Sequence, residues 1–192
     1  MTSLATLSRG DYRVRIIQDS DQRNPRSEFT NLAHALTIDT HLGNYIEVDP
    51  DGGPLEAAWK RVAWNYKAGV DTFERYARIY HGATVIEHRP ARGAVSLWYL
   101  TAADIEEHGI ENPEALIRTE ISQYQAWADG EVYSLLAEKL ALLQEIGKPE
   151  APIRREWNSF HAESGLYGIE YATEAANDLL DRAPETWAAV SG

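Results

Sequence analysis

The segment ATVIEHRPARGAVSLWYL, residues 83–100, limits the folds open to this chain more than any other. Residues 83–89 and 94–100 are rich in β-branched and aromatic side chains, and a four-residue turn containing Pro90 and Gly93 lies between them. This pattern predicts a β-hairpin. The segments on both sides of it have helical periodicity, so we expect an antiparallel sheet, formed by an N-terminal strand and this hairpin, packed with several helices. The predicted fold class is therefore α+β.

Helical periodicity is clearest between Pro54 and Tyr80, where apolar residues recur every three or four positions. The pattern predicts a helix with a buried aromatic stripe. Gly69 precedes Asp71 and Glu74, which have the spacing of a capping box. We therefore expect a kink, or the start of a second helix, at this point.

Start and stop signals define further helices after the hairpin. Thr101 with Asp104 predicts a capped helix that ends at Gly109, and Asn112 followed by Pro113 predicts the start of another. The period of residues 169–182 predicts a last helix, for which we expect one buried side formed by Tyr171, Ala175 and Leu179.

The remaining segments give weaker signals. Residues 12–17, YRVRII, alternate polar and apolar side chains, which predicts a strand; residues 41–49 and 156–168 are further strand candidates. Residues 29–36 are predicted as a short helix. Residues 131–146 begin like a strand but contain the Leu, Ala, Glu and Lys of a helix, so both structures stay open there.

Composition limits the organisation and the chemistry. A chain of 192 residues with 44% hydrophobic residues has enough apolar surface for one core, so we expect a single domain over residues 1–192 in which residues 1–10 form a flexible arm. The absence of Cys excludes disulfides and cysteine nucleophiles. No P-loop or G-x-G-x-x-G pattern is present, so we expect no cofactor. No apolar run reaches the roughly 18 residues that span a bilayer, and no signal peptide is apparent, so we expect a cytoplasmic protein without membrane contact.

The stretch IIQDSDQRNPRSEF, residues 16–29, combines aspartates, arginines, Asn24 and Pro25. These residues are typical of a turn that ends a strand, which is our first interpretation. The alternative is a site for a hard cation, in which Asp19 and Asp21 meet three acids from a second strand end, namely Glu47, Asp49 and Asp51. That alternative predicts a metal-dependent hydrolase or nuclease.

The net charge of −12 is unevenly distributed along the sequence. Residues 1–100 carry twelve Lys+Arg and twelve Asp+Glu, whereas residues 101–192 carry six and eighteen. This acidic half, residues 101–192, is expected to repel phosphate, which argues against direct nucleic-acid binding, and to attract basic surfaces. An ordinary solvated acidic surface is the simpler alternative.

One set of carboxylates in this half is the predicted interaction site: Asp104, Glu106, Glu107, Glu111, Glu114 and Glu120. Helix dipoles account for Glu114 and Asp104, because acids stabilise helix starts. A string of carboxylates on helices also imitates the phosphates of a nucleic-acid strand, and so fits a channel that binds nucleic acid.

Part of the chain resembles a set of uncharacterised proteins from bacteriophages and mobile elements, with an N-terminal pattern Y-x-I-x-I-x-Q-D-x-D-x-x-N-P-R. The matching positions here begin at Tyr12 and end at Arg26, and Asn31-Leu32 follow. Residues 121–133, ISQYQAWADGEVY, match a second stretch in part, after which those proteins have a strand; this favours strand for residues 131–136. The segment AHALTID departs from the set. The resemblance implies an origin on a mobile element, and it implies no catalytic residues.

We therefore predict a non-enzymatic, acidic protein encoded by a phage or mobile element. It is expected to bind, and to inhibit, a host protein of a defence or nucleic-acid-handling system that has a basic surface. The metal-dependent hydrolase is the alternative, and a small oligomerising module is a third hypothesis. The oligomeric state does not follow from the sequence.

Overall fold

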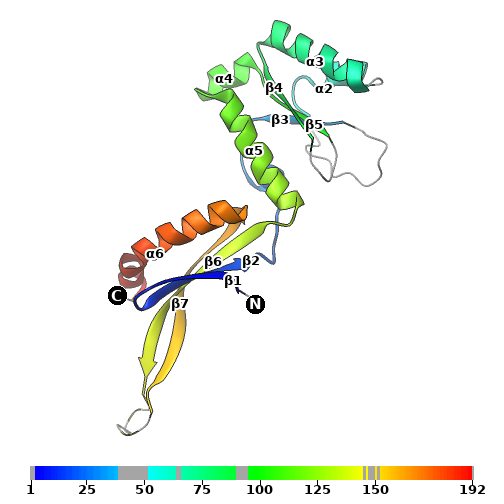
Figure 1. Cartoon of the computed structure of the whole chain (residues 1–192). Coiled ribbons are helices and arrows are strands. Elements are labelled where there is room, and N and C mark those ends of the chain that lie inside the picture. The colour runs from blue at the N-terminus through cyan, green and yellow to red at the C-terminus, as the bar shows by residue number, and fades with distance from the viewer. Residues whose placement is uncertain are drawn as a thin grey trace. The chain divides into compact units, whose positions relative to one another are not determined.

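The computed structural model describes residues 3–38, 52–63, 66–89, 95–144, 146, 150 and 152–191. The single domain expected over residues 1–192 comprises two compact units: unit 1 contains residues 1–23 and 129–192, and unit 2 contains residues 24–128. Each unit has its own antiparallel sheet, with one helix packed on the sheet of unit 1 and several helices packed on that of unit 2 (Figure 1). The predicted α+β class is confirmed, with the N-terminal strand and the central hairpin in different sheets.

Unit 1 contains a four-stranded sheet in the order β1-β2-β6-β7, in which all neighbours are antiparallel. Its strands are β1 (Ser3–Arg9), β2 (Tyr12–Gln18), β6 (Val132–Leu143) and β7 (Arg154–Tyr167). The strand predicted over residues 12–17 is confirmed as β2. The flexible arm predicted over residues 1–10 is wrong, because β1 pairs with β2 through a tight turn in which Gly10 has φ 58°. β1 is an edge strand with exposed side chains, so it lacks the alternation of polar and apolar residues by which strands were predicted from the sequence.

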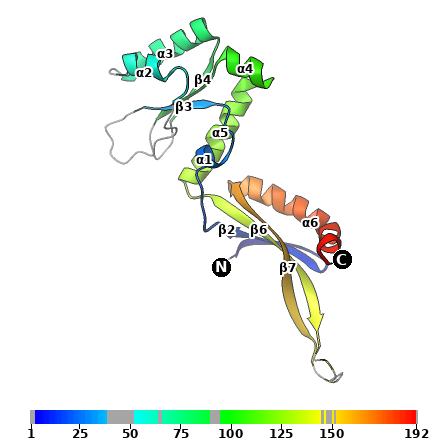
Figure 2. The same cartoon turned by 180° about the vertical axis from the view of Figure 1, so that it is seen from behind.

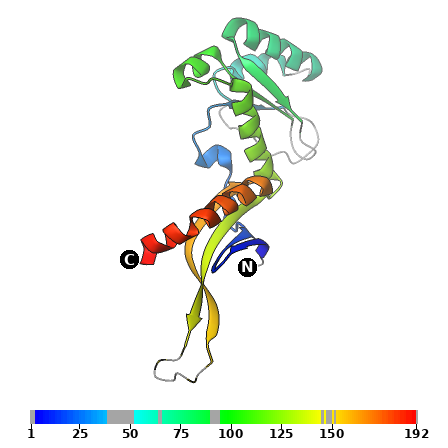
Figure 3. The ribbon, with the colours of Figure 1, turned by 60° about the vertical axis from the view of Figure 1, so that its left-hand side comes forward.

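Helix α6 (Ile169–Ser191) covers one face of this sheet (Figure 3). Its small and aliphatic residues pack with Val14 and Ile16 of β2 and with Leu135 of β6. Tyr171, which was predicted on the buried side, is 57% exposed, and the last helix continues through Pro184.

Strand β6 settles the segment for which helix and strand were both open. Its residues pair with β2 on one side and with β7 on the other, and Val132, Leu135 and Ala137 are buried. The two flanking strands form the backbone hydrogen bonds that a helix would form within itself. Tertiary pairing therefore outweighs the helical composition of this segment.

Unit 2 contains a three-stranded sheet in the order β3-β5-β4 between two layers of helices (Figure 2). Its strands are β3 (His34–Thr37), β4 (Thr84–His88) and β5 (Ser96–Leu100). The hairpin predicted within residues 83–100 is confirmed by the antiparallel pairing of β4 with β5. The short helix predicted over residues 29–36 is wrong, because β3 pairs with β5 there. The strand predicted over residues 41–49 lies outside the described residues.

The helices of unit 2 are α1 (Pro25–Glu28), α2 (Glu56–Val62), α3 (Tyr66–His81), α4 (Ala102–His108) and α5 (Pro113–Ala128). Tyr99 of β5 packs in the core with residues of α2 and α3, whereas its neighbour Trp98 packs in the core with residues of α5. Alternation along β5 thus fills both cores, which is why the strand is continuously apolar.

Local signals predicted several helix ends correctly. Thr101 and Asp104 form a complete capping box, and Gly109 ends α4 in the left-handed conformation. The long helix expected between Pro54 and Tyr80 is divided into α2 and α3, but the division follows Val62, and Asp71 lies inside α3 rather than at its start. Within the described residues, no helix combines the length and the apolar character needed to cross a membrane.

The capping box of α4 gives a first prediction. Because Thr101→Ala removes the hydroxyl that accepts from the Asp104 N–H, we expect a loss of about 1 kcal/mol in the free energy of unfolding. Thr101→Ser keeps the hydroxyl and is the matched control. Urea unfolding followed by circular dichroism measures both, and equal stability of the two variants would contradict the role of the cap.

Candidate functional site

The acids predicted as an interaction surface divide into two groups in unit 2. Glu106 and Glu107 on α4, Glu111 after it, and Glu114 at the start of α5 are exposed. Glu114 accepts from Arg118 one turn further along α5, at 2.7 Å. Four of the six predicted carboxylates thus lie on the surface.

The other two predicted acids serve the internal structure. Asp104 accepts from the Thr101 N–H and hydroxyl, both at 2.7 Å, and lies 3.5 Å from His34 Nε2. Burial alone would raise the pKa of Asp104, but the hydrogen bonds from Thr101 and the nearby His34 hold it below its ordinary value. Glu120 accepts from Arg26 at 2.9 Å and from the N–H groups of residues 32 and 33 at 2.9 and 3.3 Å. Both carboxylates are thus engaged in hydrogen bonds within unit 2.

The contrast in charge between the sequence halves does not carry over to the folded units. Each unit contains nine Lys+Arg and fifteen Asp+Glu, so each has a net charge of −6. Arginines of the first half also pair with acids of the second half: Arg26 with Glu120, and Arg9 with Asp181. The acidity is therefore shared, and specific surfaces matter more than the totals of each half.

A buried example of this pairing lies on the face of the unit 1 sheet opposite α6. Glu138 on β6 is 3% exposed and accepts from Arg13 at 2.6 Å and from Arg15 at 2.8 and 3.1 Å. The Arg13 guanidinium stacks over the Trp157 ring at 4.2 Å. Burial opposes ionisation, but the two arginines hold the pKa of Glu138 below its ordinary value.

Helix α6 carries a row of carboxylates that the sequence analysis did not identify. Its members recur at intervals of four, four, three and four residues, and all are exposed: Glu170, Glu174, Asp178, Asp181 and Glu185. Such intervals keep side chains on one face of a helix. The buried residues of α6, among them Ala172, Ala176 and Leu179, lie on the opposite face. We call this set the acidic row; it runs for about 22 Å along α6.

Positive charge near the acidic row is sparse. Arg9 forms an ion pair with Asp181, and Arg182 donates from Nε to the backbone carbonyl of Asp178 at 3.3 Å. In the part of the chain that the structure describes, the other four carboxylates of the row have no Lys or Arg partner. The spacing was visible in the sequence, but the wrong buried side assigned to this helix concealed it.

In the stretch of residues 16–29, Asp19 is a structural anchor. It is 8% exposed; its Oδ1 accepts from the Asp21 N–H at 2.9 Å, and its Oδ2 accepts from the Ser134 hydroxyl at 2.9 Å and the Gly165 N–H at 3.1 Å. Burial favours the neutral acid, but these hydrogen bonds hold the pKa of Asp19 below its ordinary value. The carboxylate therefore joins the end of β2 to β6 and β7.

The following residues of this stretch also serve the backbone. The Asn24 side chain caps α1 by accepting from the Arg26 N–H at 2.9 Å, and Pro25 opens the helix. Arg26 stacks over Trp98 at 4.9 Å and donates to the Ala33 carbonyl at 2.8 Å. This arrangement supports the interpretation of the stretch as a turn and connection.

The alternative metal site would need Asp19 and Asp21 together with Glu47, Asp49 and Asp51. Asp21 pairs with Arg23 at 2.9 Å, and the last three acids lie outside the described residues. Among the residues that the structure does describe, no group of three or more His, Asp or Glu is placed to hold a metal ion. The metal-dependent activity stays a prediction.

A hollow of about 400 Å³ in unit 2 lies between α3, β4 and the start of α5. Its lining includes Arg78 and Arg118 beside residues 83–86. Each arginine pairs with a glutamate one turn away on its own helix, Arg78 with Glu74 at 3.8 Å and Arg118 with Glu114. Because both arginines are already paired, the hollow is a weak candidate site for a charged ligand. The acidic row is the stronger candidate site.

The role of Asp19 is testable by Asp19→Asn. In this variant an amide NH₂ group replaces one carboxylate oxygen and faces N–H or O–H groups that donate to Asp19 in the wild type. We therefore expect a loss of about 1–3 kcal/mol in the free energy of unfolding at pH 7. Asp21→Asn, in an exposed ion pair, is the control and is expected to cost less than about 1 kcal/mol.

The pH dependence of this difference follows from the lowered pKa of Asp19. The ionised carboxylate stabilises the fold above the ordinary value of 3.8, and the stabilisation is lost as the pH falls through the lower folded value. The gap in stability between the wild type and Asp19→Asn should therefore narrow on acidification below about pH 4. A melting temperature that rises with Mg²⁺ in the wild type but not in Asp19→Asn would instead favour the metal site.

Comparisons with protein-family models, with curated proteins and with solved structures found no match to this chain. The resemblance to phage and mobile-element proteins stays a prediction. We therefore infer the function from the chemistry of the residues described above.

Proposed function

We propose that this protein is encoded by a phage or mobile element and binds a host protein with a basic surface through the acidic row of α6, thereby inhibiting it. The observation that carries the proposal is the row itself: five exposed carboxylates on one face of a single helix. The N-terminal resemblance supports the origin. It does not bear on the partner.

Rigidity makes the acidic row suited to recognition. The opposite face of α6 packs against the sheet of unit 1, with Ala172 and Ala176 fully buried. The helix therefore holds its carboxylates at fixed intervals of about one turn, about 5.4 Å, before any partner arrives. A preorganised surface loses less conformational entropy on binding than a flexible acidic tail.

The electrostatics of the row favour a cationic partner. Four of its carboxylates have no Lys or Arg partner in the described part of the chain, so their field is not cancelled locally. A linear array of negative charge raises the rate of encounter with basic surfaces and disfavours acidic ones. Regularly spaced carboxylates also resemble a phosphate backbone, so a nucleic-acid-binding groove is the class of surface that fits best. Occupying that groove would inhibit the host protein.

Unit 2 has an acidic surface of its own. Glu106, Glu107 and Glu111 are exposed on and after α4, and no Lys or Arg of the described residues pairs with them. These three acids are fewer than the five of the acidic row, and they span a shorter stretch of the chain. We therefore assign the main contact to α6 and treat these three acids as a second, weaker contribution.

The proposal predicts that neutralising the row abolishes binding. A variant with Glu170→Gln, Glu174→Gln, Asp178→Asn and Glu185→Gln removes the four unpaired charges. We expect it to lose the proteins that the wild type captures from a bacterial lysate at about 50 mM salt, and the wild type to lose them at about 500 mM salt. Quantitative mass spectrometry of the captured proteins measures both effects.

A matched control removes the same number of charges elsewhere in unit 1: Asp11→Asn, Glu131→Gln, Glu150→Gln and Glu156→Gln, all at exposed positions. This control should retain the captured proteins, and duplex DNA should displace them if the surface that binds the row is a nucleic-acid groove. Equal capture by the row variant and the wild type, with unchanged melting temperatures, would refute the proposal.

A further inference from the structure

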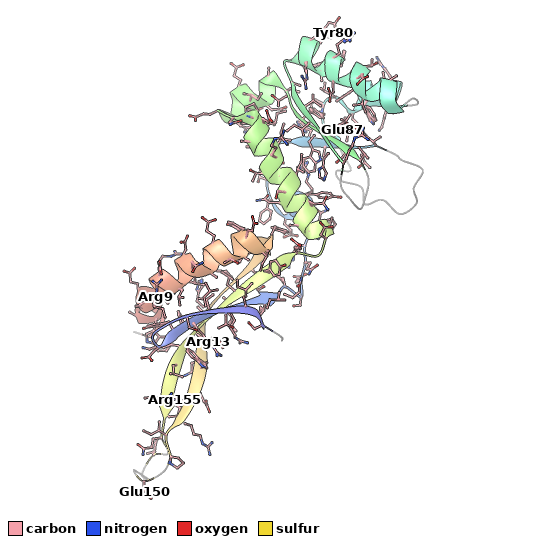
Figure 4. All side chains as sticks on the ribbon, viewed as in Figure 1. Arg9, Arg13, Tyr80, Glu87, Glu150 and Arg155 are labelled. Carbon is pink, nitrogen blue, oxygen red and sulfur yellow. The ribbon has the colours of Figure 1, made fainter. Side chains whose placement is uncertain are left out.

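A helix covers only one face of the unit 1 sheet. Val14 and Ile16 of β2 pack with α6, so Arg13 and Arg15, which alternate with them, project from the opposite face. Figure 4 shows the labelled Arg13 on this side of the sheet, away from α6. Among the described residues of unit 1, α6 is the only helix. No helix of this unit therefore covers the second face, which we call the open face.

The ion pairs on the open face contain one guanidinium more than Glu138 requires. Arg15 alone contacts both carboxylate oxygens, from Nε to Oε2 at 2.8 Å and from Nη2 to Oε1 at 3.1 Å. Arg13 adds a contact from Nε to Oε2 at 2.6 Å. Because two guanidinium groups meet a single carboxylate, this cluster keeps a surplus positive charge.

The surplus charge is held in a fixed position. Arg13 is tied to the buried Glu138 through Nε, and its guanidinium carbon lies 4.2 Å from the centroid of the Trp157 ring. A planar guanidinium that is already fixed by a hydrogen bond and by an aromatic stack loses little conformational entropy when it binds a ligand. The open face thus presents a preorganised cation.

Hydrogen-bond donors of the cluster remain open. In the part of the chain that the structure describes, the two Nη groups of Arg13 and Nη1 of Arg15 have no partner, and none of these groups is buried. Ser159 of β7 lies opposite Glu138 in the register of the sheet, and its side chain is exposed on the same face. The surplus charge is therefore accompanied by N–H donors from two arginines and by a hydroxyl.

We propose that the open face binds the phosphate group of a small ligand at Arg13, Arg15 and Ser159. A terminal phosphate carries about two negative charges and three acceptor oxygens. Arginine suits this group because its parallel N–H donors match the spacing of phosphate oxygens. A small ligand fits better than a nucleic-acid chain, because unit 1 has a net charge of −6 and repels a long polyanion. The acidic row lies on the far side of α6 and takes no part.

The first test titrates inorganic phosphate into the whole chain at pH 7, with sodium chloride adjusted to keep the ionic strength constant. Nuclear magnetic resonance follows the Nε–H signals of Arg13 and Arg15 and the indole N–H signal of Trp157. We expect these signals to shift and to saturate. The Nε–H signal of Arg118 is the control, since this exposed arginine of unit 2 is paired with Glu114, and it should change little.

Two further probes identify the source of the phosphate. Adenosine 5′-monophosphate adds a base, which can stack on an aromatic ring or on a guanidinium plane. Tighter binding of this nucleotide than of inorganic phosphate would assign the site to nucleotides, and equal binding would assign it to the phosphate group alone. Adenosine lacks the phosphate and should not bind.

A matched pair of variants tests the position of the site. Ser159→Asp places a carboxylate beside the two arginines, so we expect the dissociation constant for phosphate to rise at least about tenfold. Asn158→Asp adds the same charge at the neighbouring exposed residue, whose side chain points to the other face, and should bind nearly like the wild type. Arg13→Lys keeps the charge but removes the paired donors, and is also expected to weaken binding.

Three results would overturn the proposal. They are shifts of the Arg118 signal as large as those of Arg13 and Arg15, equal affinity of Ser159→Asp and Asn158→Asp for phosphate, and binding of adenosine as tight as that of its monophosphate. Circular dichroism and melting temperatures of the variants check that the fold is retained, which is expected for residues 158 and 159 because both are exposed.

Discussion

Unit 1 depends on buried carboxylates that join the two ends of the chain. Asp19 accepts from Ser134 and Gly165, which are 115 and 146 positions away, and Glu138 accepts from Arg13 and Arg15 across a similar separation. Closing such long loops costs chain entropy, and burying a charge costs desolvation, so each carboxylate is tolerated only because several donors surround it. The same requirement makes the pairing specific. A shifted register between β2 and β6 would leave Glu138 buried without its arginines.

Elements encoded by neighbouring residues could be predicted from the sequence. The helix from Ala102 to His108 is an example, because Thr101, Asp104 and Gly109 supply its start and its end within nine positions. Elements decided by distant neighbours could not. β6 has the composition of a helix and becomes a strand because β2 and β7 flank it, and β1 lacks a periodic pattern because it lies at an edge.

The acidic surfaces also depend on contacts between residues that are distant in the sequence. Counting charges along the chain located the acids in residues 101–192, but the fold uses Glu120, Glu138 and Asp181 to neutralise arginines from the first half. Whether an acid remains unpaired depends on tertiary contacts, and a count of charges along the sequence does not reveal them. The acidic row was accessible in principle, since its intervals match a helical period, but recognising it required the buried face of α6. That face is defined by Ala172, Ala176 and Leu179, and the small side chains of the two alanines gave a weak hydrophobic signal.

The division of unit 1 into two chain segments has a consequence for biosynthesis. A ribosome completes β1 and β2 first, then all of residues 24–128, and only afterwards the strand β6 that pairs with β2 and the helix α6 that covers Val14 and Ile16. At about 5–20 residues per second, the nascent hairpin waits for several seconds or longer with its apolar face open. Unit 2, whose residues are contiguous, has no such delay. The N-terminal hairpin is therefore the segment for which a cell's chaperones have the longest opportunity to act.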